Sequence, residues 1–428
     1  MRKMKDSGLG YLGEVPVHWN IERIKNHLRF TPDKNPGNAT VLSLYREHGI
    51  VPKDSREDNH NVTSEDTSNY RYVRIGDFVV NKMKAWQGSM GVSDYEGVVS
   101  PAYYVYRFTT DAFNKRYLHY LLRSKCYADE FRRLSGGIRI GQWDLPKAGF
   151  ETTYVAVPPK DEQTTIAEAI DVQLNKVDAL IANVQAQIEK LKAYKTSIIT
   201  EAVTLGLNPS VSYKDSGLQW VSEIPDTWDN RKMITILSMR VVDGPHESPV
   251  LHNEGIPYIS ATAIENGKIN FDLMRGYISE EYCDLCDIRY KPQLHDILVI
   301  KLGASTGQVA IVETEDRFNI WVPLAAVRCN DEADPYFVYY AFQSDYFKRQ
   351  MELSWTYGTQ QTLGVKTIER LRILLPPLEE QKEIVAYLDD KRDRIDRLIA
   401  IKQAKIEKLE QYKRSLIYEY VTGKKEVP

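Results

Sequence analysis

The chain has 428 residues and a net charge of −3; 43% of its residues are hydrophobic and 27% are charged. This length suits two or three domains, and the composition is ordinary for a globular protein. No apolar run approaches the ~18 residues of a membrane span, and the start, MRKMKDSGLG, has no apolar signal region. We therefore expect a cytoplasmic protein that does not enter a membrane.

A short lead-in opens the chain and occurs twice. The motif KDSGL begins at Lys5 and again at Lys214. A glutamate, a proline and a tryptophan follow in both copies, at Glu14, Pro16 and Trp19 and at Glu223, Pro225 and Trp228. Because an internal repeat reflects a repeated structural unit, this pattern predicts two equivalent halves.

The first globular region, residues 20–156, mixes strand and helix signals. Residues 77–80 and 102–106 are rich in β-branched and aromatic side chains, which predicts strands. Residues 117–134 have the pattern of one amphipathic helix. A glycine-rich loop follows at residues 135–141, so we expect a mixed α/β module.

Two segments of this region carry side chains that suit nucleic acid. The first predicted strand is followed by two cations, an aromatic ring and an amide, namely Lys82, Lys84, Trp86 and Gln87. The glycine-rich loop is flanked by basic and amide side chains, namely Arg132, Arg133, Arg139 and Gln142. Arginine can bind guanine, and glutamine adenine, through paired hydrogen bonds. Alternatives stay open, since core packing explains Trp86 equally well and an exposed charged face explains the arginines.

A long helix comes next and is repeated. Residues 157–204 align with residues 375–422 at an offset of 218, without a gap and with about half of the positions identical. Apolar residues step by four and three through the first copy, at Ile170, Leu174, Val177, Ile181, Val184, Ile188 and Leu191. This heptad predicts a coiled coil, and the two copies pair most simply with each other.

Both predicted long helices have terminal signals. Each begins with a Pro-Pro pair followed by acids, which suits a helix N-terminus. Gly206 and Gly423 are the expected stops. Arg392 and Lys402 interrupt the apolar stripe of the second copy, so its seam is predicted to be less apolar.

The second globular region, residues 229–374, has a similar layout. A predicted strand at 296–300 leads into the loop KLGASTG at 301–307, and a helix at 336–351 precedes a polar loop at 356–362. Lysine, hydroxyl groups and glycine amides suit phosphate contacts, although a plain turn explains the first loop equally well. The candidate DNA-contacting residues here are Lys301, Ser305, Thr306, Gln308, Tyr357, Thr359, Gln360 and Gln361.

No motif predicts catalysis, a cofactor or a metal. The KLGASTG loop lacks the Gly-Lys-Ser/Thr ending of a Walker sequence. Cys283 and Cys286 have CxxC spacing but no second pair of ligands. The segment at Asp334 lacks the second proline of an amino-methyltransferase loop, and Asp243-Gly-Pro-His246 is better explained as a turn. We expect no catalytic, cofactor-binding or metal-binding residues, and hence no enzyme.

This repeated plan resembles the specificity subunits of type I restriction-modification systems. The segments that carry the resemblance are Pro158-Pro-x-x-Glu-Gln163 and Pro376-Pro-x-x-Glu-Gln381 for the spacer helices, and Asp243-Gly-Pro-His246, Gly255-Ile-Pro-Tyr-Ile-Ser260, Tyr277-Ile-Ser279 and Asp296-Ile-Leu to Lys301 for a target-recognition domain. The resemblance implies a protein that recognises double-stranded DNA without modifying it. It implies docking of two methyltransferase subunits that carry AdoMet, and of two motor-nuclease subunits for cleavage.

The predicted fold is α+β, with two similar mixed α/β target-recognition domains separated by a long antiparallel two-helix coiled coil in a pseudo-two-fold repeat. The expected domains are residues 1–156, the spacer helix 157–206, residues 207–374, and the spacer helix 375–424. The predicted function is recognition of a bipartite DNA site, one half per domain. Two alternatives stay open: a coiled-coil scaffold with two protein- or sugar-binding modules, and a stand-alone DNA-modifying enzyme.

Overall fold

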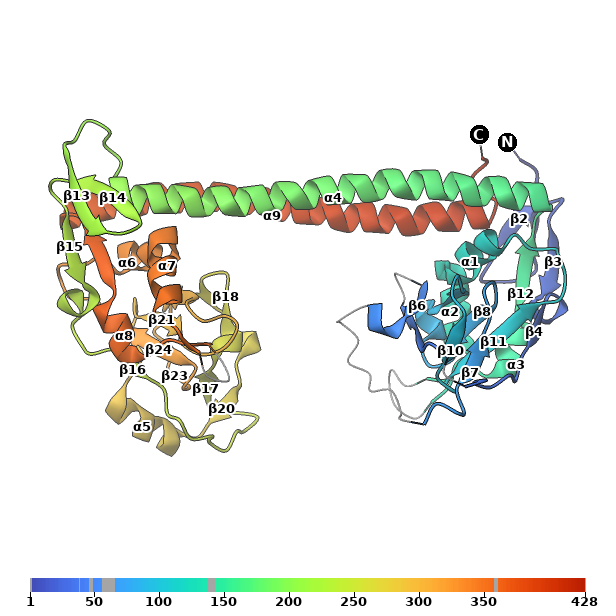
Figure 1. Cartoon of the computed structure of the whole chain (residues 1–428), viewed down its shortest axis with the longest axis horizontal. Helices are drawn as coiled ribbons and strands as arrows, with labels where there is room; N and C mark the ends of the chain where they lie inside the picture. Colours follow the sequence, from blue (N-terminus) through green and yellow to red (C-terminus); the bar gives the residue numbers. More distant parts are fainter. Residues whose placement is uncertain are drawn as a thin grey trace. The chain divides into compact units, whose positions relative to one another are not determined.

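The computed structural model describes residues 2–37, 39–45, 49–55, 66–137, 143–357 and 361–427, with the Tyr357 side chain left out. The chain divides into two compact units, the first formed by Met1–Gln185 with Ala404–Pro428 and the second by Ala186–Gln403. Two long helices, α4 (Lys160–Leu205) and α9 (Leu378–Val421), each contribute a segment to both units (Figure 1).

The first unit contains one globular module. Its strands are β1 (Met4–Asp6), β2 (Glu14–Pro16), β3 (Asn20–Arg23), β4 (Leu28–Phe30), β5 (Leu42–Tyr45), β6 (Gly49–Pro52), β7 (Arg71–Val73), β8 (Phe78–Asn81), β9 (Met90–Val92), β10 (Gly97–Val99), β11 (Tyr103–Phe108) and β12 (Tyr154–Val157). Its helices are α1 (Lys115–Arg123), α2 (Lys125–Leu134) and α3 (Lys147–Thr152), with 3-10 turns at η1 (Ile24–Asn26), η2 (Lys53–Ser55) and η3 (Ala85–Gln87).

The second unit contains the other module. Its strands are β13 (Tyr213–Leu218), β14 (Val221–Pro225), β15 (Asp229–Lys232), β16 (Val242–Asp243), β17 (Ile256–Ile259), β18 (Ile264–Glu265), β19 (Lys268–Ile269), β20 (Gly276–Ile278), β21 (Ile297–Ile300), β22 (Val309–Ile311), β23 (Asn319–Ile320), β24 (Leu324–Val327), β25 (Thr356–Tyr357), β26 (Gln361–Thr362) and β27 (Arg372–Leu375). Its helices are α5 (Glu280–Arg289), α6 (Pro335–Gln343), α7 (Asp345–Leu353) and α8 (Val365–Arg370), with 3-10 turns at η4 (Met233–Ile236), η5 (Ala261–Ala263) and η6 (Phe271–Leu273).

An antiparallel four-stranded sheet forms the centre of each module. Its order is β4-β11-β8-β9 in the first module and β16-β24-β21-β22 in the second. The central strands β8 and β21 are buried along their whole length, as continuous apolar runs predict. The second module adds a three-stranded sheet, β20-β17-β23. The mixed α/β prediction for both modules is confirmed.

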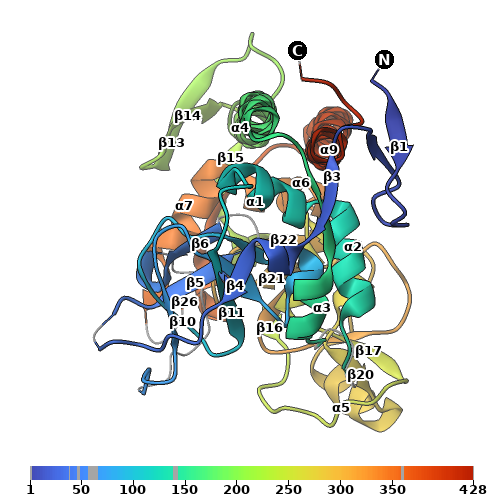
Figure 2. The same ribbon diagram turned by 90° about the vertical axis from the view of Figure 1, so that its right-hand side faces the viewer.

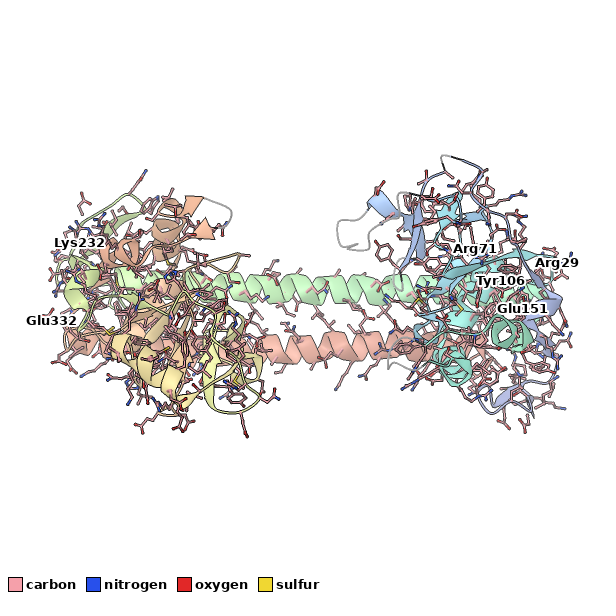
Figure 3. All side chains as sticks on the ribbon, turned by 90° about the horizontal axis from the view of Figure 1, so that it is seen from below. Arg29, Arg71, Tyr106, Glu151, Lys232 and Glu332 are labelled. Atoms are coloured by element: carbon pink, nitrogen blue, oxygen red, sulfur yellow. The ribbon has the colours of Figure 1, made fainter. Side chains whose placement is uncertain are left out.

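Aromatic rings fill the core of the first module. Tyr106 on β11 is fully buried, with its ring centroid 5.9 Å from Phe30 and 5.0 Å from Phe150. The guanidinium of Arg71 lies 5.0 Å from the centroid of Phe30. Figure 3 labels Arg71, Tyr106 and Glu151 in this module. Large rings in such contacts bury much apolar area and hold the sheet against α3.

The helical segment after each central sheet is broken, which corrects the single helix predicted at 117–134 and its counterpart at 336–351. Ser124 separates α1 from α2, and Ser344 separates α6 from α7, both with extended backbone at ψ 156° and 155°. Their hydroxyls donate to the carbonyls of Leu121 and Ala341 at 2.6 Å. The serine satisfies a carbonyl at the end of the first helix, so the chain can turn there at little cost in hydrogen bonds.

A buried glutamine anchors the start of each long helix. Gln163 and Gln381 are fully buried. Their side-chain amides donate to the carbonyl of the first proline of the Pro-Pro pair, at 2.8 and 2.9 Å. Their side-chain carbonyls accept from the backbone N–H of Asn114 at 2.8 Å and of Asp334 at 2.7 Å. Asn114 and Asp334 are the N-cap residues of α1 and α6. The glutamine of the repeated Pro-Pro-x-x-Glu-Gln motif therefore joins each long helix to its module.

Within each unit the segments of α4 and α9 run antiparallel (Figure 1), and Figure 2 shows the two helices end-on, side by side. In the first unit the start of α4 shares a core with the end of α9, and Lys413 Nζ lies 2.6 Å from Asp178. In the second unit the end of α4 shares a core with the start of α9, and Lys195 Nζ lies 2.8 Å from Asp396. The two ion pairs occupy equivalent positions of the repeat, so the predicted pairing of the two copies is confirmed.

The predicted helix seam and stops agree with the structure. Val177, Ile181 and Val184 are buried, whereas the half-buried Lys402 donates to a glutamine of α4, as a less apolar seam requires. Gly206 and Gly423 follow the helix ends with φ of 72° and 71°. This left-handed conformation is the usual reason for glycine after a helix.

Candidate nucleic-acid interface

The two modules place a lysine at the same point of the same loop. Lys82 follows β8 and Lys301 follows β21. The N–H of Lys82 donates to a carbonyl before β11 at 3.3 Å, and the N–H of Lys301 donates to the carbonyl before β24 at 2.8 Å. Their carbonyls accept from Leu145 at 2.9 Å and Leu363 at 2.8 Å. The segment after the second helix of each module is therefore tied to the lysine loop.

In the second module this lysine, Lys301, is buried in an ion pair within the protein. Lys301 Nζ lies 2.7 Å from Asp243, and both side chains are 8% exposed. Arg289 and His246 also pair with Asp243. Burial tends to raise the pKa of Asp243, but these cations outweigh that effect and hold its pKa below the usual range. The sequence interpretation of Asp243 to His246 as a plain turn missed this ion-paired carboxylate.

The remaining candidates of this loop divide into internal and exposed groups. The Thr306 hydroxyl donates to the Gly303 carbonyl at 2.7 Å and is buried. Ser305 is half-buried and Gln308 is exposed. The Gly303 N–H donates to the Gln361 carbonyl at 3.1 Å, which brings the two predicted polar loops together. The second of them begins and ends in the β25-β26 ladder. Thr359, Gln360 and the Tyr357 side chain lie outside the described residues.

In the first module the corresponding lysine lies nearer the surface. Lys82 Nζ is 2.8 Å from Asp144, with side-chain exposures of 29% and 48%. Lys84 is exposed and Gln87 is half-buried. Trp86 is half-buried; its indole N–H donates to a backbone carbonyl of the same loop at 3.1 Å. The four candidates of this loop therefore lie beside one another on η3 and its flanks.

The second predicted segment of this module supplies arginines of two kinds. Arg132 lies with its guanidinium 5.6 Å from the ring centroid of Trp143, and this ring is 5.5 Å from that of Trp86. Arg133 instead binds Glu130 through two hydrogen bonds of 2.7 and 2.8 Å, which raise the pKa of Arg133. Sequence reasoning missed Trp143, because an aromatic residue after a glycine-rich loop carries no distinct signal. Arg139 and Gln142 lie outside the described residues.

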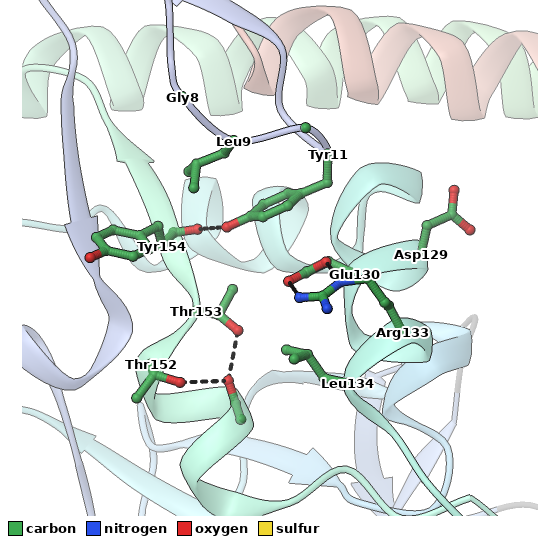
Figure 4. A pocket seen from close by; sticks show the side chains of 12 residues that line it. Gly8, Leu9, Tyr11, Asp129, Glu130, Arg133, Leu134, Thr152, Thr153 and Tyr154 are labelled. Carbon is green, nitrogen blue, oxygen red and sulfur yellow. Dashed lines mark hydrogen bonds and ion pairs between the residues drawn. The ribbon is translucent and has the colours of Figure 1, made fainter.

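A hollow of about 650 Å³ opens beside Glu130 and Arg133. It lies between the turn after β1, the end of α2 and the α3–β12 junction. Figure 4 shows Tyr11 pointing toward Tyr154, whose carbonyl accepts from the Tyr11 hydroxyl at 2.8 Å. Glu130 and Arg133 lie on the opposite wall. Two acids and one arginine line the hollow, so its net charge is unfavourable for phosphate groups.

The two cysteines with CxxC spacing are packed inside the second module. Cys283 and Cys286 are buried on α5, and burial raises the pKa of Cys283 to about 11, so its thiol stays protonated near neutral pH. Over the part of the chain that the structure describes, no cluster of metal-ligating side chains occurs. Across those same residues, no helix has the length and apolar character to span a membrane.

Comparison with known proteins identifies the architecture. Residues 226–411 match the family described as the type I restriction modification DNA specificity domain. These residues therefore carry a type I specificity domain, and the chain as a whole is similar to type I restriction-modification specificity subunits. Such subunits are non-catalytic and provide DNA sequence recognition.

Similar specificity subunits cover nearly the whole chain. The putative type I restriction enzyme MjaX specificity subunit of Methanocaldococcus jannaschii is 26% identical over 96% of this chain and 95% of its own length. The MjaVIII specificity subunit of the same organism is 25% identical over 96% and 93%. A solved chain from a study of complex assembly in the type I restriction-modification system shares the fold with a TM-score of 0.66, covering 96% of this chain and 99% of that chain at 15% identity.

Proposed function

We propose that this specificity subunit recognises a bipartite site in double-stranded DNA, with one half bound by each module. The observation that carries the proposal is the repeated lysine loop and the segment tied to it, which present different side chains in the two modules. Lys84, Gln87 and Arg132 are available in the first module, and Ser305, Gln308 and Gln361 in the second. A common backbone frame with different polar groups suits recognition of two different base sequences.

Binding should depend on local cations, because the whole chain carries a net charge of −3. Lys84, Lys125 and Arg132 are exposed in the first module. Cations that neutralise DNA phosphates release counterions, so the affinity for duplex DNA should fall steeply as salt rises. A coiled-coil scaffold carrying protein- or sugar-binding modules would show no salt-dependent binding to duplex DNA.

The long helices supply two equivalent surfaces for partner subunits. Leu180 on α4 and its repeat counterpart Leu398 on α9 are 49% and 46% exposed, and the counterparts Tyr194 and Tyr412 are 56% and 47% exposed. Within each unit, one leucine and one tyrosine flank the ion pair between the helices. Two copies of one surface suit two copies of one partner. We infer two methyltransferase subunits, with AdoMet bound in them and not in this chain, two motor-nuclease subunits for cleavage, and a cytoplasmic location.

Module exchange tests the proposal directly. Residues 229–374 would be replaced by those of a specificity subunit with a different target, and the hybrid would be assembled with its methyltransferase partner. Sequencing of methylated DNA should show one half of the recognised site changed and the other half retained. The matched control replaces residues 20–156 and should change the opposite half. A hybrid that alters both halves, or a wild-type complex without any preferred sequence, would contradict the proposal.

A further inference from the structure

Two neighbouring arginines at the end of α2 have different surroundings. The Nε and one terminal nitrogen of Arg133 are both bonded to Glu130, which is only 8% exposed. Among the residues that the structure describes, Arg132 has no carboxylate partner, and its guanidinium lies over Trp143. A guanidinium held against an aromatic face keeps its N–H edges free for hydrogen bonds. Arg132 is therefore the arginine of this pair that can bind a further acceptor.

The ring beneath Arg132 is itself fixed on both sides. Asp144, next to Trp143, exchanges two backbone hydrogen bonds with Gly136, at 3.0 and 3.2 Å. Its side chain binds Lys82 Nζ at 2.8 Å. Trp86 contacts the ring of Trp143 at 5.5 Å between centroids. These contacts hold Trp143 in place beside Arg132 and limit the orientations of the arginine.

The space beside this stack is open. A hollow of about 390 Å³ is lined by Arg132, Arg133, Ser135, Trp143 and Asp129. Since Glu130 occupies Arg133, the Arg132 guanidinium is the free cationic group at this hollow among the described residues. The edge of a base needs such access, because bidentate recognition requires two N–H groups in the plane of the base pair.

The second module lacks this arrangement. The positions equivalent to Arg132, Trp143 and Trp86 are occupied by Glu352, Gln361 and Ser305. Equivalence follows from the shared helix break for the first pair and from the shared backbone bonds around the lysine loop for the others. A glutamate at this point cannot donate to the O6 and N7 atoms of guanine. The stack is thus specific to the first module.

We propose that Arg132 recognises a guanine in the half-site bound by the first module, and that Trp143, supported by Trp86, is the residue that positions it. This inference rests on the proposed function. Paired N–H groups of arginine match the two acceptors that guanine presents in the major groove, and this is the commonest specific contact in protein–DNA complexes. Contact with Trp143 restricts the side chain of Arg132 before DNA binds, so less side-chain freedom is lost on binding.

The test uses the full subunit assembled with its methyltransferase partner and duplexes with every base substitution in the first half-site. Arg132→Ala should lose roughly 5- to 150-fold discrimination at one guanine and leave the second half-site unchanged. Replacing that guanine by 7-deazaguanine removes N7, and should weaken wild-type binding without further weakening Arg132→Ala. Arg132→Lys should keep the salt dependence of binding but lose the discrimination, because lysine lacks the planar fork.

The positioning role has its own readout. Trp143→Ala should reduce discrimination at the same guanine, Trp143→Phe should restore most of it, and the Ala effects at 132 and 143 should not add. Arg133→Ala is the matched control and should leave base preference unchanged. If Arg132→Ala weakens all sequences uniformly, the residue binds phosphate and the inference fails. If the wild-type complex prefers no sequence, the proposed function itself fails. Thermal unfolding of each variant separates loss of fold from loss of recognition.

Discussion

The two modules place equivalent lysines in different surroundings. Lys82 and Lys301 follow equivalent buried strands and make equivalent backbone hydrogen bonds, yet Lys301 is 8% exposed and bound to Asp243, whereas Lys82 is 29% exposed and bound to Asp144. Because the Lys301–Asp243 pair is buried, breaking it costs stability. The Lys82–Asp144 pair is partly exposed to solvent and contributes little to stability. A repeated frame therefore does not give a repeated role to each side chain.

Removing the carboxylate partner of each lysine should give the largest contrast between the modules. Asp243→Ala leaves Lys301 buried without its partner and should destabilise the second module by about 3–5 kcal/mol. Asp144→Ala should cost the first module less than about 1 kcal/mol, because its ion pair is solvent-exposed. Urea denaturation followed by hydrogen exchange in each module measures both. Equal losses would show that exposure does not distinguish the two lysines.

The buried glutamines should behave alike, which tests the similarity of the two frames. Gln163→Ala and Gln381→Ala each remove hydrogen bonds to three backbone groups near a helix start and leave these groups without that partner. Each variant should lose about 2 kcal/mol of unfolding free energy in its own module. Gln187→Ala, at a half-buried position on α4, serves as a control with a smaller loss. A large effect in only one of the two modules would contradict equivalent anchoring.

The smallest expected effect is an opposite response of the modules to acid. Interactions with Lys301 and its neighbours lower the pKa of Asp243 despite its burial, so its contribution to stability is present above its unfolded pKa and is lost as pH falls through the lowered value. Burial raises the pKa of Asp77 in the first module, so this carboxyl takes up its proton more readily in the folded state and favours folding as pH falls.

Asparagine substitutions isolate these two carboxyl groups. Asp243→Asn should make the second module less sensitive to acid, and Asp77→Asn should make the first module more sensitive. Unfolding midpoints measured from pH 7 down to pH 3 give the two slopes. Changes of the same sign in both modules would refute the comparison.

Local patterns predicted the repeated elements well. The heptad of α4, with Val177, Ile181 and Val184 buried, and the stops at Gly206 and Gly423 depend on residues within one or two helical turns. The apolar runs that form β8 and β21 are also local. Such features follow from backbone geometry and side-chain spacing, which a short stretch of sequence determines.

The candidate site was predicted only in part. The sequence located the lysine loops and the polar segments after the second helices, and the structure brings them together through backbone hydrogen bonds. It did not indicate that Lys301 is occupied by Asp243 or that Thr306 binds its own loop. Residue type shows which contacts a side chain can make, whereas burial and competing partners decide which of them it makes.

By itself the sequence determined the two-fold repeat, the long helices with their ends, the mixed α/β modules and the resemblance to the specificity subunits. Only the tertiary structure decided that the helical segments break at Ser124 and Ser344, that Glu130 occupies Arg133, and that Trp143 lies beneath Arg132. The physical reason is that local spacing allows several contacts and does not choose among them. Glu130 and Arg133 are neighbours on one helix turn, but the surroundings of Arg132 depend on Trp143, which the folded chain brings beneath it.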